Sequence, residues 1–307
     1  MEVRRIGGDD GVDISIVGIG CNAFGRRLSE SESIPVIHAA MDAGITFFDT
    51  AEGYGDGLSE QYIGRAIKGR RDEIRIATKF GYNVQHAMDK GKGSAENIRL
   101  AIDRSLKNLG TDYVDLYQIH RFDPSTPIAE TLGALNDLVV AGKVRLIGCS
   151  NFSGAQLRDA AETARRMGIA SFVTLQNQWS LFDRGIEEEV VPACADLGTG
   201  ILPFYPLARG LLTGKYRRGE GGPSGSLLEG KLDGTDFGTL EALEAFAVSR
   251  GFSLLTLAVS WLASNPVTAS VICGAARPDQ PAQNAAAAAW KMTPEDFAEI
   301  DRILGQG

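Results

Sequence analysis

Four side chains that can take part in proton transfer follow the ends of three apolar, strand-like segments. They are Asp49 and Tyr54 after segment 45–48, Lys79 after segment 74–78, and His120 after segment 114–119. In a barrel of parallel strands the carboxyl ends of the strands meet on one face, where catalytic residues collect. A single Asp or His after a strand is usually a turn or hydrogen-bonding residue. Four such residues on three successive strand ends predict an active site.

These four side chains suit the protonation of a substrate oxygen. The pKa of a tyrosine hydroxyl is about 10, which is high for a proton donor near neutral pH. A lysine ammonium next to Tyr54 favours the phenolate and lowers that pKa, and a carboxylate such as Asp49 holds the ammonium in place. His120 can hydrogen-bond a carbonyl oxygen and orient it. Together these four side chains suit the reduction of a carbonyl group, provided that a hydride donor reaches the carbonyl carbon.

Around these residues the chain resembles the aldo-keto reductase family. The matching segments are 49–55, 77–81, 118–123, 148–152, 176–177, 206–216 and 274–284. They extend across nearly the whole chain, and motifs in this number and order are a specific signal. The resemblance implies that Asp49, Tyr54, Lys79 and His120 are the catalytic residues.

The order of the predicted elements favours the fold of that family. Strand-like segments at 17–21, 45–48, 74–78, 113–119, 143–148, 172–175, 200–204 and 269–273 alternate with helix-like segments. Repeated alternation implies a parallel sheet, and this many strands favour an α/β fold of the closed (β/α)8 TIM-barrel class. The predicted helices include 35–43 and 184–197, with extra helices near the C-terminus at 240–248, 253–263 and 294–304.

The N-terminal residues predict a further element outside the barrel. Segments 3–6 and 12–16 flank a turn rich in Gly and Asp, which is typical of a β-hairpin. The resemblance implies that this hairpin closes the bottom of the barrel. The chain has 307 residues and no linker rich in Pro and Ser. Because barrels of more than about 250 residues commonly form one unit, residues 1–307 are expected to form a single domain.

The resemblance also implies a nicotinamide cofactor. The residues at the matching positions are Ser150, Asn151 and Gln176 for the carboxamide, Phe204 for the ring face, Leu207, Gly210 and Lys215 for the pyrophosphate, and Arg277, Gln280 and Asn284 for the adenosine end. Arg277 is placed to pair with a 2′-phosphate, which favours NADPH over NADH. Tyr205 replaces the small residue that usually follows the aromatic one. Each position also has an ordinary explanation as a strand-end cap, a packing residue or a surface residue.

Composition and motifs argue against several other classes of protein. The net charge is −8, which disfavours nucleic acid or an acidic membrane surface as the main partner. No secretory leader and no run of about 18 apolar residues is seen, so a cytoplasmic location is expected. There is no G-x-G-x-x-G or P-loop motif, and three histidines without ligand spacing predict no metal site. The four cysteines form no C-x-x-C pair and are expected to be buried and reduced.

Three functions follow from these residues. The first is an NADPH-dependent oxidoreductase that reduces aldehydes or ketones to alcohols, or runs in reverse, with Tyr54 as the proton donor. The second is an aldolase-type barrel enzyme in which Lys79 forms a Schiff base. The third is a subunit that binds the cofactor, senses redox state and regulates a partner. The intact set of four polar residues favours the first.

The substrate is expected to be a small carbonyl compound or alcohol, and the oligomeric state is left open. Loops that follow the strands form the pocket walls in this family; here they are 24–27, 81–93, 122–125 and 217–238. Phe24, Tyr82 and Phe122 are candidates for an apolar lining. Segment 217–238 is long and rich in Gly and Ser, and it is interpreted either as a mobile loop over the site or as an ordinary insertion.

Overall fold

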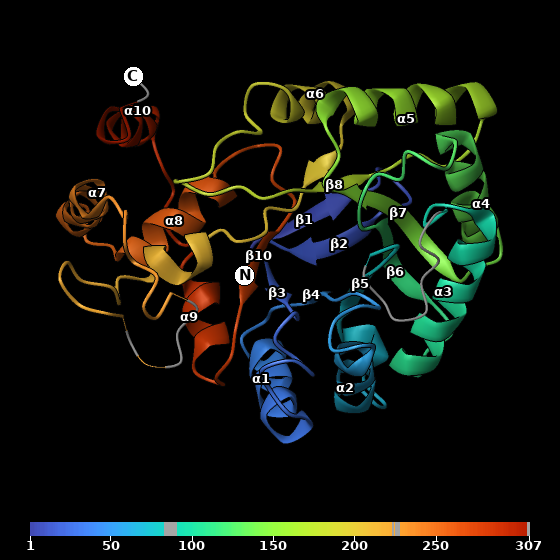
Figure 1. The fold of residues 1–307 in the computed structure, drawn as a ribbon, viewed down its shortest axis with the longest axis horizontal. Coiled ribbons are helices and arrows are strands. Elements are labelled where there is room, and N and C mark those ends of the chain that lie inside the picture. The colour runs from blue at the N-terminus through green and yellow to red at the C-terminus, as the bar shows by residue number, and fades with distance from the viewer. Residues whose placement is uncertain (83–90, 223, 225–227, 306–307) are drawn as a thin grey trace.

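The computed structural model describes residues 1–82, 91–222, 224 and 228–305. Eight parallel strands form one sheet in the order β10-β3-β4-β5-β6-β7-β8-β9 (Figure 1). Their bounds are β3 Val17–Gly20, β4 Phe47–Asp49, β5 Arg75–Phe80, β6 Val114–Ile119, β7 Val144–Ser150, β8 Thr174–Gln176, β9 Gly200–Ile201 and β10 Val271–Gly274.

Parallel bridges join the two ends of this sheet. Ile201 in β9 pairs with Thr268, and Phe204 pairs with Ile272 in β10. The backbone N–H of Ile272 donates to the carbonyl oxygen of Pro203 at 3.0 Å. Because β10 also pairs with β3 at the start of the sheet, the strands close into a ring, and the predicted (β/α)8 barrel is confirmed.

The predicted hairpin consists of β1 (Val3–Ile6) and β2 (Val12–Ser15), which pair antiparallel. Its apolar side chains pack against side chains inside the barrel. This inner cluster contains Ile6, Val12 and Ile14 of the hairpin together with Phe47, Ala77, Leu116, Leu202, Ala269 and Ile272. Phe47 is the first residue of β4, so the hairpin covers the amino-terminal end of the barrel, as expected.

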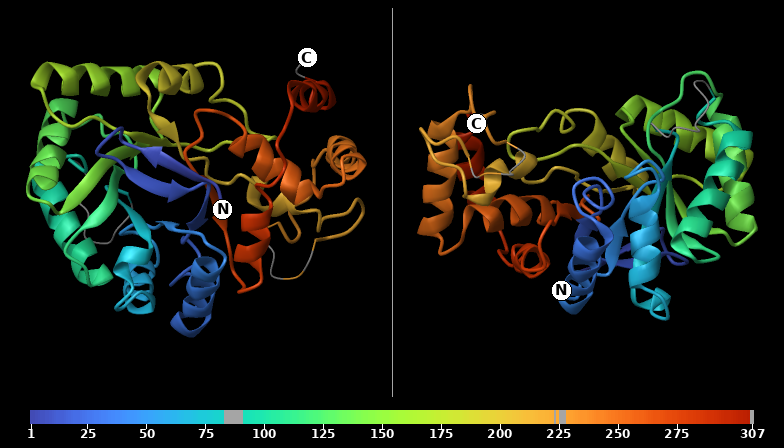
Figure 2. Two further views of the ribbon diagram at one scale, coloured as in Figure 1. Left: turned by 180° about the vertical axis from the view of Figure 1, so that it is seen from behind. Right: turned by 60° about the horizontal axis from the view of Figure 1, so that its bottom comes forward.

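Helices cover the outside of the ring and extend it on one side (Figures 1 and 2). Their bounds are α1 Glu30–Asp42, α2 Leu58–Ala66, α3 Ala95–Leu109, α4 Ile128–Val140, α5 Gly154–Met167, α6 Val190–Leu197, α7 Phe237–Ser249, α8 Leu254–Ala263, α9 Gln280–Ala286 and α10 Pro294–Ile303. The extra helices predicted near the C-terminus are α7, α8 and α10. Figure 2 shows α7 and α10 at the side of the molecule away from β5 and β6.

The starts of helices α1 and α6 differ most from the predictions. Helix α1 begins at Glu30, well before the predicted start at Pro35, because Ser29 and Glu32 form a reciprocal capping box. Pro35 therefore lies inside the helix as its sixth residue, where it lacks the N–H that would bond to the carbonyl oxygen of Ser31. Helix α6 is shorter than predicted and begins at Val190, because most of the residues from Arg184 onward form turns.

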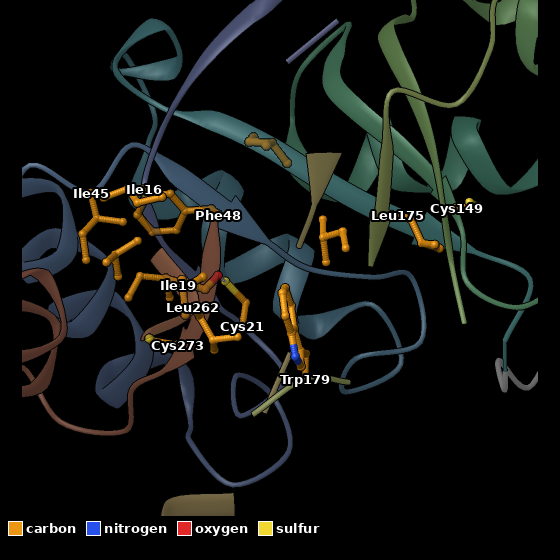
Figure 3. Close-up of a cluster of buried hydrophobic side chains, with 14 of the residues drawn as sticks. Ile16, Ile19, Cys21, Ile45, Phe48, Cys149, Leu175, Trp179, Leu262 and Cys273 are labelled. Carbon is orange, nitrogen blue, oxygen red and sulfur yellow. Dashed lines mark hydrogen bonds between the residues drawn. The ribbon is translucent and has the colours of Figure 1, made fainter. Parts of the chain in front are cut away.

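The core lies between the sheet and the helices. Figure 3 shows Ile16, Ile19, Phe48 and Ile45 in one part of this cluster. All four cysteines are buried as free thiols, as expected. Within the described residues no single helix is long and apolar enough to cross a membrane. Helices α7 and α8 reach that length and composition only as a pair, which is bent by 85°.

Candidate active site

The four predicted catalytic residues come together at the carboxyl ends of β4, β5 and β6. Asp49 is the last residue of β4, Lys79 is the next-to-last residue of β5, and His120 directly follows β6. The Nζ of Lys79 lies 2.8 Å from the carboxylate of Asp49 and 3.4 Å from the hydroxyl of Tyr54. The rings of Tyr54 and His120 meet edge to face, with centroids 6.0 Å apart. The side chains thus form one continuous polar group.

The alternation of side chains along the strands explains why this group lies inside the barrel. Successive residues of a strand point to opposite faces, so residues two apart share a face. In three neighbouring strands an apolar inner residue is followed two positions later by a polar one. These pairs are Phe47 and Asp49, Ala77 and Lys79, and Leu116 and Gln118. An apolar layer therefore supports a polar layer at the carboxyl end of the barrel.

Lys79 is fully buried and has three acceptors around its ammonium. Besides Asp49 and Tyr54, it donates to the carbonyl oxygen of Thr50 at 2.9 Å. Burial acts to lower the pKa of Lys79, but the charge of Asp49 and the contact with Tyr54 outweigh burial, so that the pKa is raised. Lys79 is therefore a cation at neutral pH.

The pKa of Tyr54 differs from our expectation. We predicted that the lysine would lower it. Burial, which disfavours the phenolate, is the largest influence and raises the pKa above its ordinary value; Lys79 opposes this effect, while Asp49 adds to it. The prediction overlooked burial and the partial neutralisation of the ammonium by its carboxylate partner. Tyr54 is consequently a neutral phenol that holds its proton.

His120 is a neutral imidazole at neutral pH. Its pKa lies well below its ordinary value because of burial first, and then because of the positive charges of Lys79 and Arg121. Its backbone N–H donates to the carbonyl oxygen of Phe80 at 2.9 Å, which fixes the loop at the end of β6. A neutral imidazole can donate one N–H to a substrate oxygen.

Two glutamines complete the surroundings of Asp49. The Nε2 of Gln176 donates to Asp49 at 2.9 Å, and that of Gln118 lies 3.5 Å from the same oxygen. Gln176 was expected to bind a carboxamide; in this structure its amide nitrogen contacts Asp49. Gln118 was not predicted, although its position two residues after Leu116 placed it on the inner face of β6. These amides satisfy and orient a buried carboxylate.

Glu52 is a second residue that sequence reasoning missed. Its backbone N–H donates to the carbonyl oxygen of Lys79 at 3.0 Å, and its carboxylate accepts from the backbone N–H of Gly81 at 2.9 Å. Arg104 of α3 pairs with the same carboxylate at 3.1 Å. Glu52 thereby joins the turn that carries Tyr54 to the end of the strand that carries Lys79.

The residues predicted for the carboxamide also lie together. The hydroxyl of Ser150 donates to the carbonyl oxygen of Gln176 at 2.8 Å. The Nδ2 of Asn151 lies 2.9 Å from that hydroxyl and 3.0 Å from the carbonyl oxygen of His120. Asn151 has a φ of 56°, a left-handed conformation that Asn tolerates better than most residues. This cluster connects the ends of β7 and β8 to the loop of His120.

The segment predicted for the pyrophosphate has the features of an anion site. It forms the 3-10 helix η2 (Ala208–Thr213), in which Gly210 has a φ of 101°. A Cβ atom added at Gly210 would lie 3.6 Å from both Nζ of Lys215 and the hydroxyl of Tyr216. That hydroxyl is buried and has no hydrogen-bond partner among the described residues. The backbone of Gly210, which has no side chain, lies beside the ammonium of Lys215 and the hydroxyl of Tyr216, and these groups together suit the binding of a phosphate.

The wall beside that segment carries two aromatic rings. Phe204 and Tyr205 meet edge to face, with ring centroids 5.3 Å apart. Tyr205 has a φ of 52° and is 37% exposed, so the residue that departs from the family pattern projects outward. The side chain of Leu207, which precedes η2, packs partly against the core.

The residues predicted for the adenosine end follow β10 and contact nearby parts of the chain: Arg277 lies in the turn, and Gln280 and Asn284 lie in α9. Arg277 forms two hydrogen bonds of 3.0 Å to Asp279. The Oε1 of Gln280 accepts from the backbone N–H groups of Ala276 and Arg277 at 2.6 and 3.2 Å. Asn284 donates to the carbonyl oxygen of Gly274 at 3.2 Å. Gln280 and Asn284 therefore shape the turn, and Arg277 keeps its second terminal nitrogen, Nη1, available.

A cavity of about 360 Å³ opens beside His120, and we call it the loop cavity. Its lining residues are Gly81, Tyr82, Lys92, Arg121, Phe122, Asp123, Pro124 and Ser125. Tyr82 and Phe122 were expected to line such a pocket, whereas Phe24 is completely buried in the core. Residues 83–90 of the predicted wall 81–93 lie outside the described residues.

Segment 217–238 is held at its beginning by ion pairs. Arg217 pairs with Glu244 at 3.1 Å, and Arg218 pairs with Glu241 at 2.9 Å, both on α7. Residues 223 and 225–227 of this segment lie outside the described residues, and its role as a mobile loop over the site stays a prediction.

Asp123 fixes one wall of the loop cavity, and we predict that it makes stability depend on acid pH. Its carboxylate accepts from backbone N–H groups of Gly93 and Ser125 at 2.8 and 2.9 Å, and from hydroxyls of Ser125 and Thr126 at 2.6 and 2.7 Å. Burial acts to raise the pKa of Asp123, but these hydrogen bonds outweigh it and lower the pKa from 3.8 to about 2.

A group with a lowered pKa stabilises the fold above its unfolded pKa, and that contribution is lost as pH falls through the folded one. Asp123→Asn should therefore reduce the free energy of unfolding by about 1 kcal/mol at neutral pH, since solvent screens this partly exposed site. In urea unfolding, the difference should shrink as pH falls from 3.8 towards about 2. Asp103→Asn, in an exposed pair, is the control. A difference that does not change with pH would contradict the assignment.

The described residues contain no group of three or more His, Cys, Asp or Glu side chains arranged to hold a metal ion. The site instead consists of a phenol, an ammonium, a carboxylate and a neutral imidazole at the carboxyl ends of parallel barrel strands. This combination at the end of a barrel is chemically suited to transferring a proton to or from a substrate oxygen.

Comparison with known proteins identifies the family. Residues 16–304 match the model of the Aldo/keto reductase family. The chain is 38% identical over 306 residues to "Probable aldo-keto reductase 1" of Glycine max, covering 95% of this chain and 86% of that protein. It is 36% identical over 327 residues to "Aldo-keto reductase YhdN" of Bacillus subtilis (strain 168), covering 99% of this chain and 94% of that protein. The chain belongs to the aldo-keto reductase family, and it is an NAD(P)H-dependent oxidoreductase.

Proposed function

We propose that this protein reduces aldehydes or ketones to alcohols with NADPH, and that Tyr54 is the proton donor. The observation that carries the proposal is the contact of the Tyr54 hydroxyl with a buried ammonium. Lys79 lies 3.4 Å from that hydroxyl and is itself held at 2.8 Å by Asp49. The same residues serve the reverse reaction, in which Tyr54 takes the proton of an alcohol.

The chemistry of the residues determines their roles. A reduced nicotinamide, when bound, supplies hydride to the carbonyl carbon. Tyr54 gives its proton to the carbonyl oxygen as negative charge develops there, and Lys79 stabilises the phenolate that remains. Asp49 keeps Lys79 charged and directed at Tyr54. The neutral imidazole of His120 donates a hydrogen bond to the same oxygen and orients the substrate.

The residues that would hold the cofactor fit its parts. Ser150 and Asn151 offer hydroxyl and amide groups beside His120 for a carboxamide, with Gln176 adjacent. Phe204 offers an aromatic face for a flat ring. Gly210 and Lys215 form the anion site for the pyrophosphate, and the ammonium of Lys215 has no ion-pair partner among the described residues.

The geometry disfavours a Schiff base on Lys79. A nucleophilic lysine must be a free amine, whereas Lys79 is fully buried and has three acceptors, and its pKa is raised. A cofactor-binding regulatory subunit would make no use of the contact between Tyr54 and Lys79. The test is oxidation of NADPH by the purified protein with a panel of aldehydes. Cofactor binding without turnover of any aldehyde would favour the regulatory subunit.

The preference for NADPH depends on Arg277. Its Nε and Nη2 are held by Asp279, so the guanidinium is fixed in place while Nη1 remains available for a 2′-phosphate. We expect Arg277→Ala to raise the Kd for NADPH about tenfold, the value of one charge-assisted contact. The Kd for NADH should change little, because NADH lacks the 2′-phosphate.

Fluorescence titration of the protein with each cofactor measures both constants. Trp179 is buried, and its backbone N–H donates to the carbonyl oxygen of Phe204, so it is a suitable reporter. Arg302→Ala is the matched control, since Arg302 is another exposed arginine with a bidentate carboxylate partner. Equal weakening of NADPH and NADH by Arg277→Ala would contradict the role in 2′-phosphate recognition.

A further inference from the structure

The loop cavity carries positive charge that its own acidic residue does not offset. Arg121 and Lys92 contribute two cations to the lining, and Asp123 contributes the one carboxylate among the described lining residues. All four hydrogen bonds of Asp123 go to backbone N–H groups and hydroxyls of Gly93, Ser125 and Thr126. The carboxylate is therefore committed to loop structure, and neither cation has an ion-pair partner within the part of the chain that the structure describes.

Arg121 is exposed, and its guanidinium lies over an aromatic ring next to the reacting group. Its guanidinium carbon lies 4.5 Å from the ring centroid of Tyr82, an arrangement that favours a cation over an aromatic face. The ring of Tyr82 in turn lies 4.9 Å from the ring of His120. The ring of Tyr82 therefore contacts both the guanidinium of Arg121 and the imidazole of His120. The positive charge of Arg121 lies about the width of one ring from the residue that orients the carbonyl group.

A guanidinium near a carbonyl site can select substrates by charge. Arginine presents a planar fork of donors that matches the geometry of a carboxylate, and it stays protonated. The open loop cavity is lined by both Arg121 and Tyr82, and the ring of Tyr82 contacts His120, so the cavity offers space beside His120 for the chain that separates the two groups of such a substrate. A purely apolar substrate would leave the cations of the cavity without partners.

We propose that the physiological substrate of this enzyme is a carbonyl compound with a carboxylate several atoms from the reacting carbonyl group, and that Arg121 binds the carboxylate. The proposal rests on the reductase function proposed above. The carboxylate is unchanged in the reaction: hydride adds to the carbonyl carbon and the proton of Tyr54 adds to its oxygen. Arg121 is thus a specificity-determining residue outside the group that moves the proton.

A matched pair of substrates tests the charge preference. 4-Carboxybenzaldehyde carries the carboxylate, and its methyl ester has nearly the same shape without the charge. The wild-type kcat/KM should be about tenfold or more higher for the acid, the effect of a charge-assisted contact. Arg121→Gln should bring the ratio close to one by lowering the kcat/KM of the acid while that of the ester stays nearly constant. Arg121→Lys should retain part of the preference.

Controls separate the possible failures. Arg166→Gln removes the same charge from an exposed arginine in the last turn of α5, outside the loops that form the pocket walls, and it should leave the ratio unchanged. A wild-type enzyme that reduces both aldehydes with equal kcat/KM overturns the charge preference and leaves the reductase function standing. An equal loss for acid and ester in Arg121→Gln would assign Arg121 to the packing of Tyr82 instead. No reduction of either aldehyde, nor of any in the panel, would overturn the reductase function itself.

Discussion

Tyr54→Phe should lower kcat for carbonyl reduction by about 1,000-fold and leave cofactor affinity and thermal stability nearly unchanged. General acid catalysis by a positioned side chain contributes about 10²- to 10⁴-fold, and the phenol is the donor nearest to Lys79 at 3.4 Å. The substitution removes one oxygen and keeps the ring that contacts His120. Steady-state kinetics with one aldehyde and saturating NADPH give the size of the effect, and cofactor titration gives the affinity.

The pKa of Tyr54 also determines how the two directions of the reaction depend on pH. Reduction needs the protonated phenol, and burial raises its pKa above the ordinary value of 10.0. The kcat for reduction should therefore stay constant through neutral pH and fall only in strongly alkaline buffer, whereas alcohol oxidation should rise with pH. The residual activity of Tyr54→Phe should lack this alkaline limb. A variant that keeps more than a tenth of wild-type kcat would mean that another group supplies the proton.

The sequence was sufficient to predict the barrel and the four residues at its centre, because both depend on local patterns. Alternation of apolar and polar residues defines each strand and its inner face. The topology of parallel strands then brings Asp49, Lys79 and His120 to the same end of the barrel. Contacts between distant loops do not follow from such patterns. Neither the hydrogen bond from the backbone N–H of Gly93 to Asp123 nor the pairing of Glu52 with Arg104 could be predicted in this way.

The prediction that the pKa of Tyr54 is lowered was wrong for a related reason. A sequence shows that a lysine lies near a tyrosine, but the pKa depends on the balance of charge and desolvation. Here the phenol is enclosed, and the cation that favours its ionisation is shared with Asp49. The same limit applies to Arg277, whose pairing with Asp279 depends on the turn after β10. Both the pKa of Tyr54 and the pairing of Arg277 depend on the positions of individual neighbouring side chains.

The buried pair of Lys79 and Asp49 links catalysis to stability. Lys79→Met should lower kcat by at least about 100-fold, because the phenolate of Tyr54 loses its nearby cation. It should also reduce the free energy of unfolding by about 3 kcal/mol or more, because it leaves the carboxylate of Asp49 buried without its counter-charge. Lys143→Met is the matched control: Lys143 pairs with Asp103 at the surface, where such a pair contributes less than about 1 kcal/mol.

The double variant Asp49→Asn with Lys79→Met separates the two effects. An amide at position 49 removes the uncompensated charge and still accepts a hydrogen bond from Gln176, which lies 2.9 Å away. Urea unfolding should therefore show recovery of most of the lost stability, because replacing both partners of a buried ion pair costs far less than removing one. The kcat should stay as low as in Lys79→Met, since no cation is restored beside Tyr54. If activity returned together with stability, the role of Lys79 would be structural, and the assignment of Tyr54 as a lysine-assisted acid would have to be abandoned.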